Sequence, residues 1–230
     1  MLVSFWSPKG GSGTSVVTAA AGLVLARAAA ARIVDLAGDQ PAVLGLAHEP
    51  DPGLLGWLRM GPQAPTDALD HLEVDVTARL SLLPSGEPSD AQPLPEAGAA
   101  LAAALDTDPR PTVCDLGRVD TPALRAFAEV AGPSVVVVRG CYLALRRAVQ
   151  HAAMAETEGA ILIDEHGRSL GAHDVEDVLG VPVLTTITAR TSTARAVDAG
   201  VLVSRLPDSL GRPLHHALRR SGWFDDERAA

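Results

Sequence analysis

Short apolar runs rich in β-branched residues alternate along this chain with stretches rich in alanine and leucine. Each short run has the length of a β-strand, and most of the stretches between them have the composition of α-helices. Strands that alternate with helices form a parallel sheet with helices on both faces, because each connection must cross over the sheet. The sequence therefore predicts a doubly wound α/β fold with a mostly parallel sheet of about seven strands. The expected strands are residues 2–6, 32–36, 80–83, 111–116, 134–139, 159–164 and 181–185.

A length of 230 residues and a hydrophobic content of 47% suit one large α/β domain, and we expect residues 1–230 to form it. Aromatic residues make up only 3% of the chain, so the core is expected to be packed from alanine, valine and leucine. Cys114 and Cys141 lie in or beside apolar runs without metal-ligand spacing, which predicts structural roles and a reducing, cytoplasmic compartment. No targeting or transmembrane segment is visible.

The only lysine of the chain, Lys9, lies in a glycine-rich loop directly after the first expected strand. The loop contains Gly10, Gly11 and Gly13, and a helix is expected over residues 15–31. Such a loop turns its backbone N–H groups inward, and the helix that follows adds the positive end of its dipole. The loop is therefore predicted to bind an anion such as phosphate. The alternative is a plain turn from strand to helix.

The loop matches known phosphate-binding patterns only in part. Against GxxxxGK(S/T), Pro8 replaces the first glycine and Thr14 replaces the lysine, while Ser15 matches the hydroxyl that ligates magnesium. The dinucleotide pattern GxGxxG fails, because Val16 occupies the position of its third glycine. The loop is thus closer to a triphosphate-binding loop than to a dinucleotide-binding one.

Residues 9–15, KGGSGTS, resemble the deviant Walker A loop, KGGxGK(T/S), of the ParA/MinD superfamily of dimerising P-loop ATPases. The TadZ/CpaE-like subgroup, from pilus-assembly systems, also lacks the second lysine, and the chain resembles this subgroup most. The resemblance implies that ATP or ADP binds with magnesium and that Lys9 reaches across a dimer interface to the partner's nucleotide. The residues implied to hold the nucleotide are Lys9, Gly10, Gly11, Ser12, Gly13, Thr14 and Ser15.

The second expected strand approaches its carboxyl end at Asp35, and ligands bind near the carboxyl ends of parallel strands. The resemblance implies a DxD switch here, in which Asp35 lies near magnesium and a second carboxylate positions the attacking water. Ala37 occupies the position of that second carboxylate. Asp39, two residues further on, is the candidate to replace it as a catalytic residue. The alternative role for Asp35 is that of a turn or helix-capping carboxylate.

Another apolar strand approaches its end at Asp115 and resembles a Walker B strand, whose terminal aspartate orders the magnesium shell. A turn or helix-capping role is again the alternative. Ser15, Asp35 and Asp115 would meet at one edge of the sheet in such a fold, so these three are the predicted metal-shell residues.

The base-recognition region departs from the family pattern. Many relatives carry an asparagine that contacts adenine after the strand at residues 159–163, whereas this chain has Asp164 there. Asp164 is therefore a candidate cofactor-binding residue, with an acidic surface turn as the alternative. Residues 181–200 resemble the strand, loop and helix that border the nucleotide in MinD-like proteins.

The net charge and the hydrophobic pattern indicate which kinds of partner the chain is expected to bind. A formal net charge of −9 disfavours nonspecific DNA binding, which depends on neutralising phosphates. A stripe of leucines near the carboxyl terminus is expected to pack on its own domain, and the acidic residues that follow it oppose direct attachment to a membrane surface. Any membrane contact is therefore expected to be indirect. The stripe comprises Leu206, Leu210, Leu214 and Leu218, with Trp223 beyond.

Phosphoryl transfer needs cations over the phosphates and a group that orients water, and the chain lacks both family residues, at Thr14 and Ala37. Hydrolysis is therefore expected to be slow or absent. The resulting hypothesis is a nucleotide-responsive, dimerising positioning protein that acts on a partner from a polar, pilus or secretion machinery, with Lys9 and Asp39 as the candidate catalytic residues. Two alternatives remain: a pseudo-ATPase scaffold that acts only through protein contacts, and an active partition ATPase.

Overall fold

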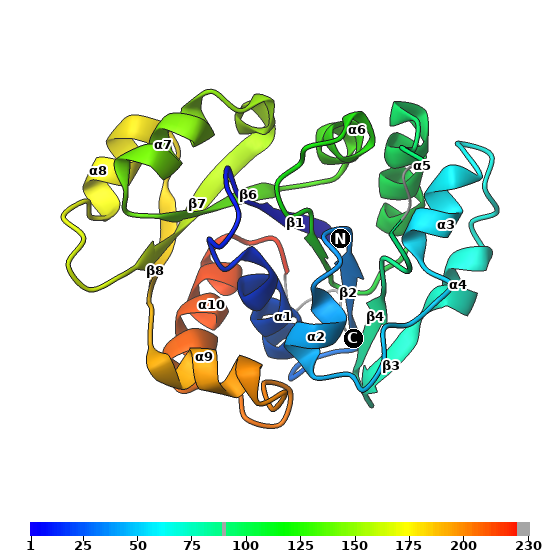
Figure 1. Cartoon of the computed structure of the whole chain (residues 1–230), viewed down its shortest axis with the longest axis horizontal. Coiled ribbons are helices and arrows are strands. Elements are labelled where there is room, and N and C mark those ends of the chain that lie inside the picture. Colours follow the sequence, from blue (N-terminus) through cyan, green and yellow to red (C-terminus); the bar gives the residue numbers. More distant parts are fainter. Residues whose placement is uncertain (89–90, 225–230) are drawn as a thin grey trace.

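The computed structural model describes residues 1–88 and 91–224, and within these ranges eight strands form one sheet (Figure 1). The strand order is β3-β4-β2-β5-β1-β6-β7-β8, and every neighbouring pair is parallel except β3 with β4. This confirms the expected α/β class. The strands are β1 (Leu2–Trp6), β2 (Ala31–Asp35), β3 (Val74–Thr77), β4 (Leu80–Leu83), β5 (Thr112–Asp115), β6 (Ser134–Arg139), β7 (Thr157–Asp164) and β8 (Val183–Thr188).

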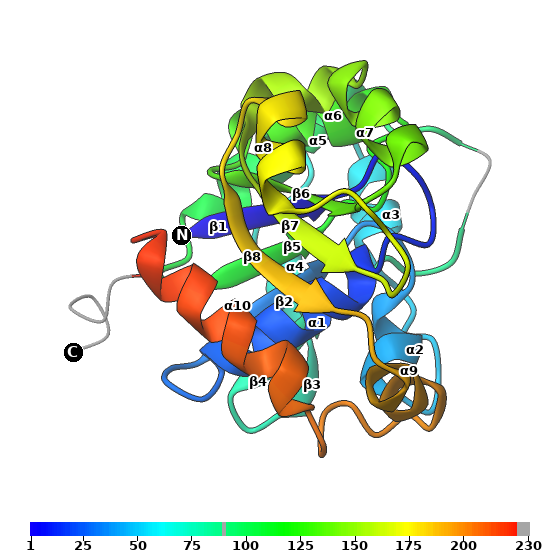
Figure 2. The same cartoon turned by 90° about the vertical axis from the view of Figure 1, so that its left-hand side faces the viewer.

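Helices cover both faces of the sheet, as Figure 2 shows. One face carries α1 (Thr14–Leu25), α2 (Gln40–Leu44), α9 (Thr191–Asp198) and α10 (Asp208–Arg220). The other face carries α3 (Leu54–Arg59), α4 (Ala68–Leu72), α5 (Pro95–Asp106), α6 (Pro122–Val130), α7 (Tyr142–Val149), the short 3-10 helix Ala152–Glu156 and α8 (Ala172–Leu179).

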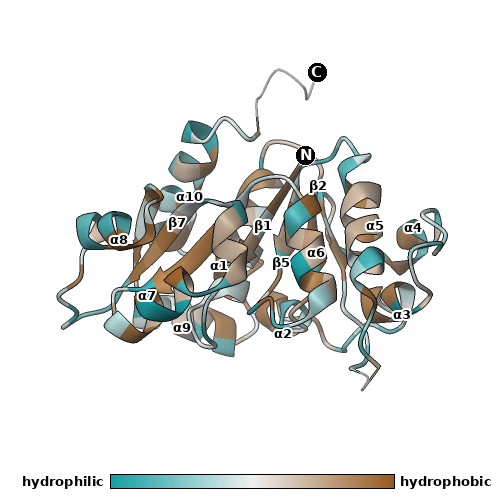
Figure 3. Ribbon diagram, turned by 90° about the horizontal axis from the view of Figure 1, so that it is seen from above, coloured by the Kyte–Doolittle hydropathy of each residue, from teal (hydrophilic) through white to brown (hydrophobic). Residues whose placement is uncertain are grey.

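The two faces have separate cores because side chains alternate along each strand. In β1, Leu2 and Trp6 pack into the core under α3–α8, whereas Val3 and Phe5 pack into the core under α1, α2, α9 and α10. All five residues of β1 are buried, as expected for a central strand covered on both sides. In Figure 3 the strands are accordingly coloured mostly hydrophobic, and much of α8 is hydrophilic.

The elements differ from the sequence-based expectation at a few boundaries. The sheet has an additional edge strand, β3, which pairs antiparallel with β4. Helix α1 ends at Leu25 instead of continuing to residue 31, because the chain turns there and Ala31 enters β2. Strand β8 lies further along the chain than expected and includes Thr188.

The leucine stripe packs on its own fold. Leu210, Leu214 and Leu218 are buried on α10, in the same core as α1, and Trp223 packs against this core. Among the described residues, no helix is long and apolar enough to cross a bilayer. The stripe therefore contributes to the core beneath α1 and α10.

Candidate functional site

The candidate site lies where β1 meets its two neighbours. β1 runs between β5 and β6, and its carboxyl end leads through residues 7–13 into α1. The connections from β1 and from β5 leave toward opposite faces of the sheet, which makes this point a topological switch. Open α/β sheets bind their ligands at such points, outside the carboxyl ends of the strands.

The loop has a backbone that glycine alone adopts readily. Gly11 has a φ of 74° and Gly13 a φ of 90°. A Cβ atom placed on Gly10, Gly11 or Gly13 would meet no atom within 4 Å, so the loop faces open space. Gly13 caps α1 without any side-chain hydrogen bond, which leaves the first N–H groups of the helix directed toward the loop. This geometry suits an anion.

Lys9 stands at the start of the loop. Its Nζ atom is exposed and lies 3.4 Å from the carbonyl oxygen of Gly10. Within residues 1–88 and 91–224 it forms no ion pair. The ammonium group is therefore available to a partner outside the subunit or to a ligand.

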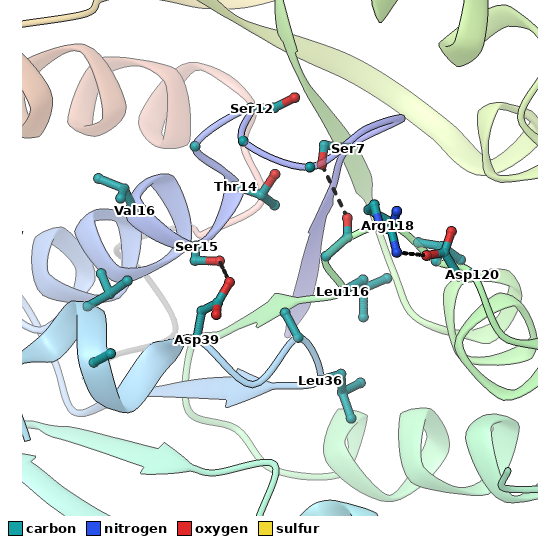
Figure 4. Close-up of a pocket in the computed structure, with 18 of the residues that line it drawn as sticks. Ser7, Ser12, Thr14, Ser15, Val16, Leu36, Asp39, Leu116, Arg118 and Asp120 are labelled. Atoms are coloured by element: carbon teal, nitrogen blue, oxygen red, sulfur yellow. Dashed lines mark hydrogen bonds and ion pairs between the residues drawn. The ribbon is translucent and has the colours of Figure 1, made fainter. Parts of the chain in front are cut away.

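A cavity of about 800 Å³ opens beside the loop (Figure 4). This volume lies in the range of small-molecule sites. Its walls come from the loop, the β2–α2 connection, the β5–α6 connection and α9. Residues 10–15 line it, together with Asp39, whereas Lys9 lies next to the cavity without lining it.

Thr14 is the first residue of α1 and stands where the GxxxxGK(S/T) pattern has its lysine. Its side chain lines the cavity and its residue is only 6% exposed. Its hydroxyl oxygen, Oγ1, is buried without a hydrogen-bond partner, and Figure 4 shows it under the loop. A buried hydroxyl without a partner is costly, so a bound polar group at this position would satisfy it.

Asp35 lies behind the cavity wall and is fully buried. Its oxygen Oδ1 accepts hydrogen bonds from the N–H groups of Ala37 and Gly38, at 3.0 and 2.7 Å, and Oδ2 accepts one from the N–H of Gln40 at 3.0 Å. Burial, followed by the nearby charge of Asp115, raises the pKa of Asp35 to about 7 against the opposing effect of these hydrogen bonds. The carboxyl thus organises the turn into α2, which is the alternative role considered from the sequence.

Asp115 is paired with Asp35 across neighbouring strands and is also fully buried. Its Oδ1 accepts the N–H of Gly117 at 3.0 Å, and its Oδ2 accepts the side-chain amide of Gln40 at 2.8 Å. Burial raises the pKa of Asp115, although hydrogen bonding from Ser15, Gln40 and Gly117 lowers it. Two buried carboxyls side by side make this edge of the sheet strongly attractive to positive charge.

Ser15 and Asp39 meet at the cavity. The Ser15 hydroxyl lies 3.4 Å from Oδ2 of Asp39, and both side chains line the wall (Figure 4). Asp39 precedes α2 but makes no side-chain capping bond, so its carboxylate points toward Ser15 instead. The structure thus brings Ser15, Asp35, Asp39 and Asp115 to one edge of the sheet.

Gln40 joins these residues, although the sequence pattern did not single it out. Its Nε2 donates to the Ser15 carbonyl at 3.0 Å and to Asp115 at 2.8 Å, while its Oε1 is buried without a partner. The available signal was its place directly after Asp39, at the carboxyl edge of a parallel strand.

The donor set fits magnesium bound together with a phosphate. Magnesium keeps several waters and takes one or two carboxylates plus phosphate oxygens. No group of three or more histidine, cysteine or acidic side chains that could hold a metal alone exists in the part of the chain that the structure describes. Ser15 and Asp39 are the cavity-facing oxygen donors, and Asp35 and Asp115 lie behind them.

Asp164 is not brought to the cavity. It ends β7, and its backbone carbonyl accepts the N–H of Ala189 at 2.7 Å. The next residue, Glu165, is paired with Arg139 at 2.6 Å and Arg168 at 3.2 Å. This arrangement matches the acidic surface turn considered as the alternative.

The fold is similar to that of several solved structures. No protein-family model matches the chain, and no curated protein matches it significantly. The septum site-determining protein MinD of Pyrococcus horikoshii, solved with Mg-ADP, is similar with a TM-score of 0.78 and 15% identity over 96% of each chain. A ParA family ATPase from Chlorobium tepidum has a TM-score of 0.77 and 19% identity over 94% of this chain and 97% of its own. MinD in the MinC:MinD complex of Aquifex aeolicus has a TM-score of 0.76 and 17% identity over 97% of this chain and 96% of its own. The chain therefore has the fold of the MinD/ParA P-loop ATPases.

Proposed function

We propose that this chain is a nucleotide-responsive positioning protein of the ParA/MinD type, which binds ATP or ADP with magnesium and dimerises through the face that carries the loop. The cavity of about 800 Å³ beside residues 10–15 carries the proposal. It lies at the switch point of a fold shared with a MinD solved with Mg-ADP. The KGGSGTS loop adds sequence support.

Each part of the site has a role in this proposal. The N–H groups of the loop and of the first turn of α1 hold the phosphates, and the unpartnered hydroxyl of Thr14 donates to them. Ser15 and Asp39 would hold magnesium, and Asp35 and Asp115 would add negative charge from behind in their ionised forms. Bound magnesium would neutralise charge on the phosphates. Lys9, half-buried as a residue and without an ion pair among the described residues, would reach the nucleotide of a second copy through its exposed Nζ.

Hydrolysis is slow or absent under this proposal. Catalysis of phosphoryl transfer depends almost wholly on positioning and on stabilising charge. At position 14 a neutral hydroxyl replaces an ammonium group, and at position 37 a methyl group replaces a carboxylate. Asp39 points at Ser15, which places its carboxylate on the metal side of the cavity.

The biological role that we propose is to localise a pilus or secretion assembly in the cytoplasm through a protein partner. Its support is the resemblance to TadZ/CpaE-like proteins in the loss of the second loop lysine. Both cysteines are free, in keeping with a reducing compartment. Co-purification of the tagged chain with and without ATP, followed by identification of the bound proteins, tests this role.

One observation favours a second candidate, a scaffold that binds no nucleotide. The carboxylates of Asp35 and Asp115 already accept five hydrogen bonds from within the chain. Gln40 supplies one of these hydrogen bonds and also donates to the carbonyl of Ser15. Its side chain thus links Ser15 to Asp115 without a metal ion between them. An active partition ATPase is the least favoured candidate, because of Thr14, Ala37 and a net charge of −9.

Titration calorimetry with ATP and magnesium, combined with mass measurement by light scattering, separates the candidates. Binding coupled to dimerisation supports the positioning protein, and a mass indifferent to ATP in a chain that binds none supports the scaffold. A steady-state assay of ATP hydrolysis completes the test: a turnover number near one per second would indicate the partition ATPase.

A matched pair of variants tests whether the loop is the site. Gly11→Val strains a positive-φ glycine in the loop, and Gly61→Val applies the same strain at a φ of 86° outside the cavity. Neither added Cβ meets an atom within 4 Å. Loss of nucleotide binding in Gly11→Val alone supports the assignment, whereas equal loss in both would leave only a general effect on stability.

A further inference from the structure

The turn after β5 is attached to the start of the glycine-rich loop. The N–H of Ser7 donates to the carbonyl oxygen of Gly117 at 2.8 Å, and the N–H of Gly117 donates to Asp115 at 3.0 Å. The N–H of Val119 closes the turn onto the carbonyl of Leu116 at 3.2 Å. Arg118, between Gly117 and Val119, is therefore held beside the loop and lines the cavity (Figure 4).

The backbone of this turn is unusual. Val119 has a φ of 53°, and it is the only residue other than glycine with a positive φ in the described ranges. A β-branched side chain strongly disfavours this conformation, so the surrounding structure must impose it. Val119 is 1% exposed in the core under α3–α8. The buried side chain of Val119 thus holds the turn in the form that presents Arg118 to the cavity.

Arg118 is the only basic residue that lines the cavity, as far as the described residues extend. Three aspartates line it as well, namely Asp39, Asp120 and Asp198. A cavity for a polyphosphate needs positive charge, and neither Thr14 nor the neighbouring Lys9 contributes a cation to its wall.

Arg118 is held by a weak partner. Its Nη2 lies 2.8 Å from Oδ2 of Asp120, and the two side chains are 61% and 53% exposed. An exposed pair of this kind contributes little to stability. A phosphate accepts two parallel hydrogen bonds from a guanidinium group and is the stronger partner.

We propose that Arg118 supplies to the phosphates of the bound nucleotide the positive charge that Thr14 does not, and that Asp120 holds Arg118 when the site is empty. This inference rests on the proposed function, because it needs a nucleotide in the cavity. It adds a phosphate-binding residue from the β5–α6 connection, on the opposite side of the cavity from Ser15 and Asp39.

The test measures binding of Mg-ATP and of inorganic tripolyphosphate by calorimetry to the full chain and to three variants. Arg118→Gln is expected to weaken both ligands roughly ten- to a hundredfold, because it removes a charge-assisted contact. Arg118→Lys is expected to restore part of the affinity, and adenosine, titrated in parallel, is expected to bind all the variants alike because it has no phosphate. Arg125→Gln is the matched control, since Arg125 is also exposed, lies on the adjacent α6 and does not line the cavity.

The outcomes separate this inference from the proposed function. If the unmodified chain binds Mg-ATP and Arg118→Gln binds as tightly as Arg125→Gln, the role of Arg118 is wrong while the nucleotide site stands. If the unmodified chain binds no nucleotide, both fail. A charged contact also makes affinity fall with salt, so Arg118→Gln is expected to flatten that dependence, which a purely structural effect would leave unchanged.

Discussion

Thr14 separates this loop from one that carries two lysines. Its side chain lines the cavity, and its buried hydroxyl has no partner. We expect the ammonium group of Thr14→Lys to extend into the cavity and ATP to bind roughly ten- to a hundredfold more tightly through a charge-assisted contact. Calorimetric titration of the folded variant measures this. Affinity no higher than that of the unmodified chain would contradict the phosphate-side position of residue 14.

Thr14→Val is the control, because it keeps the shape and removes the hydroxyl. A buried polar group without a partner costs about 1–3 kcal/mol, so the nucleotide-free Val variant is expected to unfold at a higher temperature. Its affinity for nucleotide should fall.

Asp35 predicts an unusual dependence of stability on pH in the chain without nucleotide or magnesium. Its pKa is about 7 in the folded protein and 3.8 when unperturbed. Between these values the native state binds more protons than the unfolded state, so the free energy of unfolding falls as pH rises from about 4 to 7. Each tenfold difference in proton affinity between the folded and unfolded states corresponds to about 1.4 kcal/mol in the free energy of unfolding. Urea unfolding at pH 5 and pH 8 measures the fall.

Asp35→Asn tests this contribution, to which the neighbouring Asp115 adds in the same direction, because burial raises its pKa as well. The Asn side chain has one oxygen in place of two, so the hydrogen bond from the N–H of Gln40 is lost. Because Asn does not titrate, the fall in the free energy of unfolding between pH 5 and pH 8 should be smaller in this variant. His151 acts in the opposite direction, because burial lowers its pKa and so its contribution rises with pH. Glu73 and Asp108, whose pKa values are lowered, act only below this range. An unchanged slope in Asp35→Asn would remove Asp35 as the cause.

Which site residues were predictable depends on what places them. Ser15, Asp35 and Asp115 follow or end strands, and parallel strands bring their carboxyl ends to one edge, so pattern alone brings them together. The direction of a carboxylate depends on its hydrogen-bond donors. Asp39 points at Ser15, and Gln40 bridges two elements, because of tertiary contacts that no local pattern encodes.

At the scale of elements, the crossing of α5 over α6 depends on Gly98. A Cβ on Gly98 would overlap the backbone carbonyl of Ala123, which a rigid helix cannot move aside. We expect Gly98→Ala to destabilise the protein by about 1–3 kcal/mol through overpacking, despite the better helix propensity of alanine. Chemical denaturation measures the change in free energy of unfolding.

Gly56 in α3 is the matched control. A Cβ there meets only the tip of the Arg59 side chain, at 3.9 Å. Gly56→Ala should therefore stabilise the protein by about 0.5–1 kcal/mol, since only the conformational effect remains. If both variants gained stability, the close crossing of α5 and α6 would be wrong.

The prediction of strands from the sequence was wrong where the local sequence pattern is weakest. Seven strands were recognised from their apolar runs, but Val74–Thr77 is short, half-buried and at the sheet edge, so it lacks a strong run. Strand β8 extends through Thr186 and Thr188, whose exposed polar side chains are typical of a loop. Gly22, in α1, packs so closely that a Cβ would lie 2.5 Å from Ile33, a contact that only the tertiary structure reveals.

At the scale of the whole molecule, substitution of Lys9 tests whether this lysine binds nucleotide within its own subunit or across a dimer interface. Among the described residues its Nζ donates one hydrogen bond, to the carbonyl of Gly10 at 3.4 Å, and forms no ion pair. Removing it should therefore leave the stability of the subunit unchanged. The loop N–H groups, Thr14 and Ser15 remain in place for nucleotide in Lys9→Ala.

We therefore expect Lys9→Ala to lose ATP-dependent dimerisation while the separate subunit still binds nucleotide, because in the proposed dimer the missing charge would act on the partner's phosphates. Sedimentation velocity with and without Mg-ATP measures the dimer, and calorimetry measures binding. Arg205→Ala, which removes an exposed basic residue away from the cavity, controls for net charge. If Lys9→Ala dimerised normally with ATP, the lysine would act within its own subunit, and the dimer would depend on surfaces outside the loop.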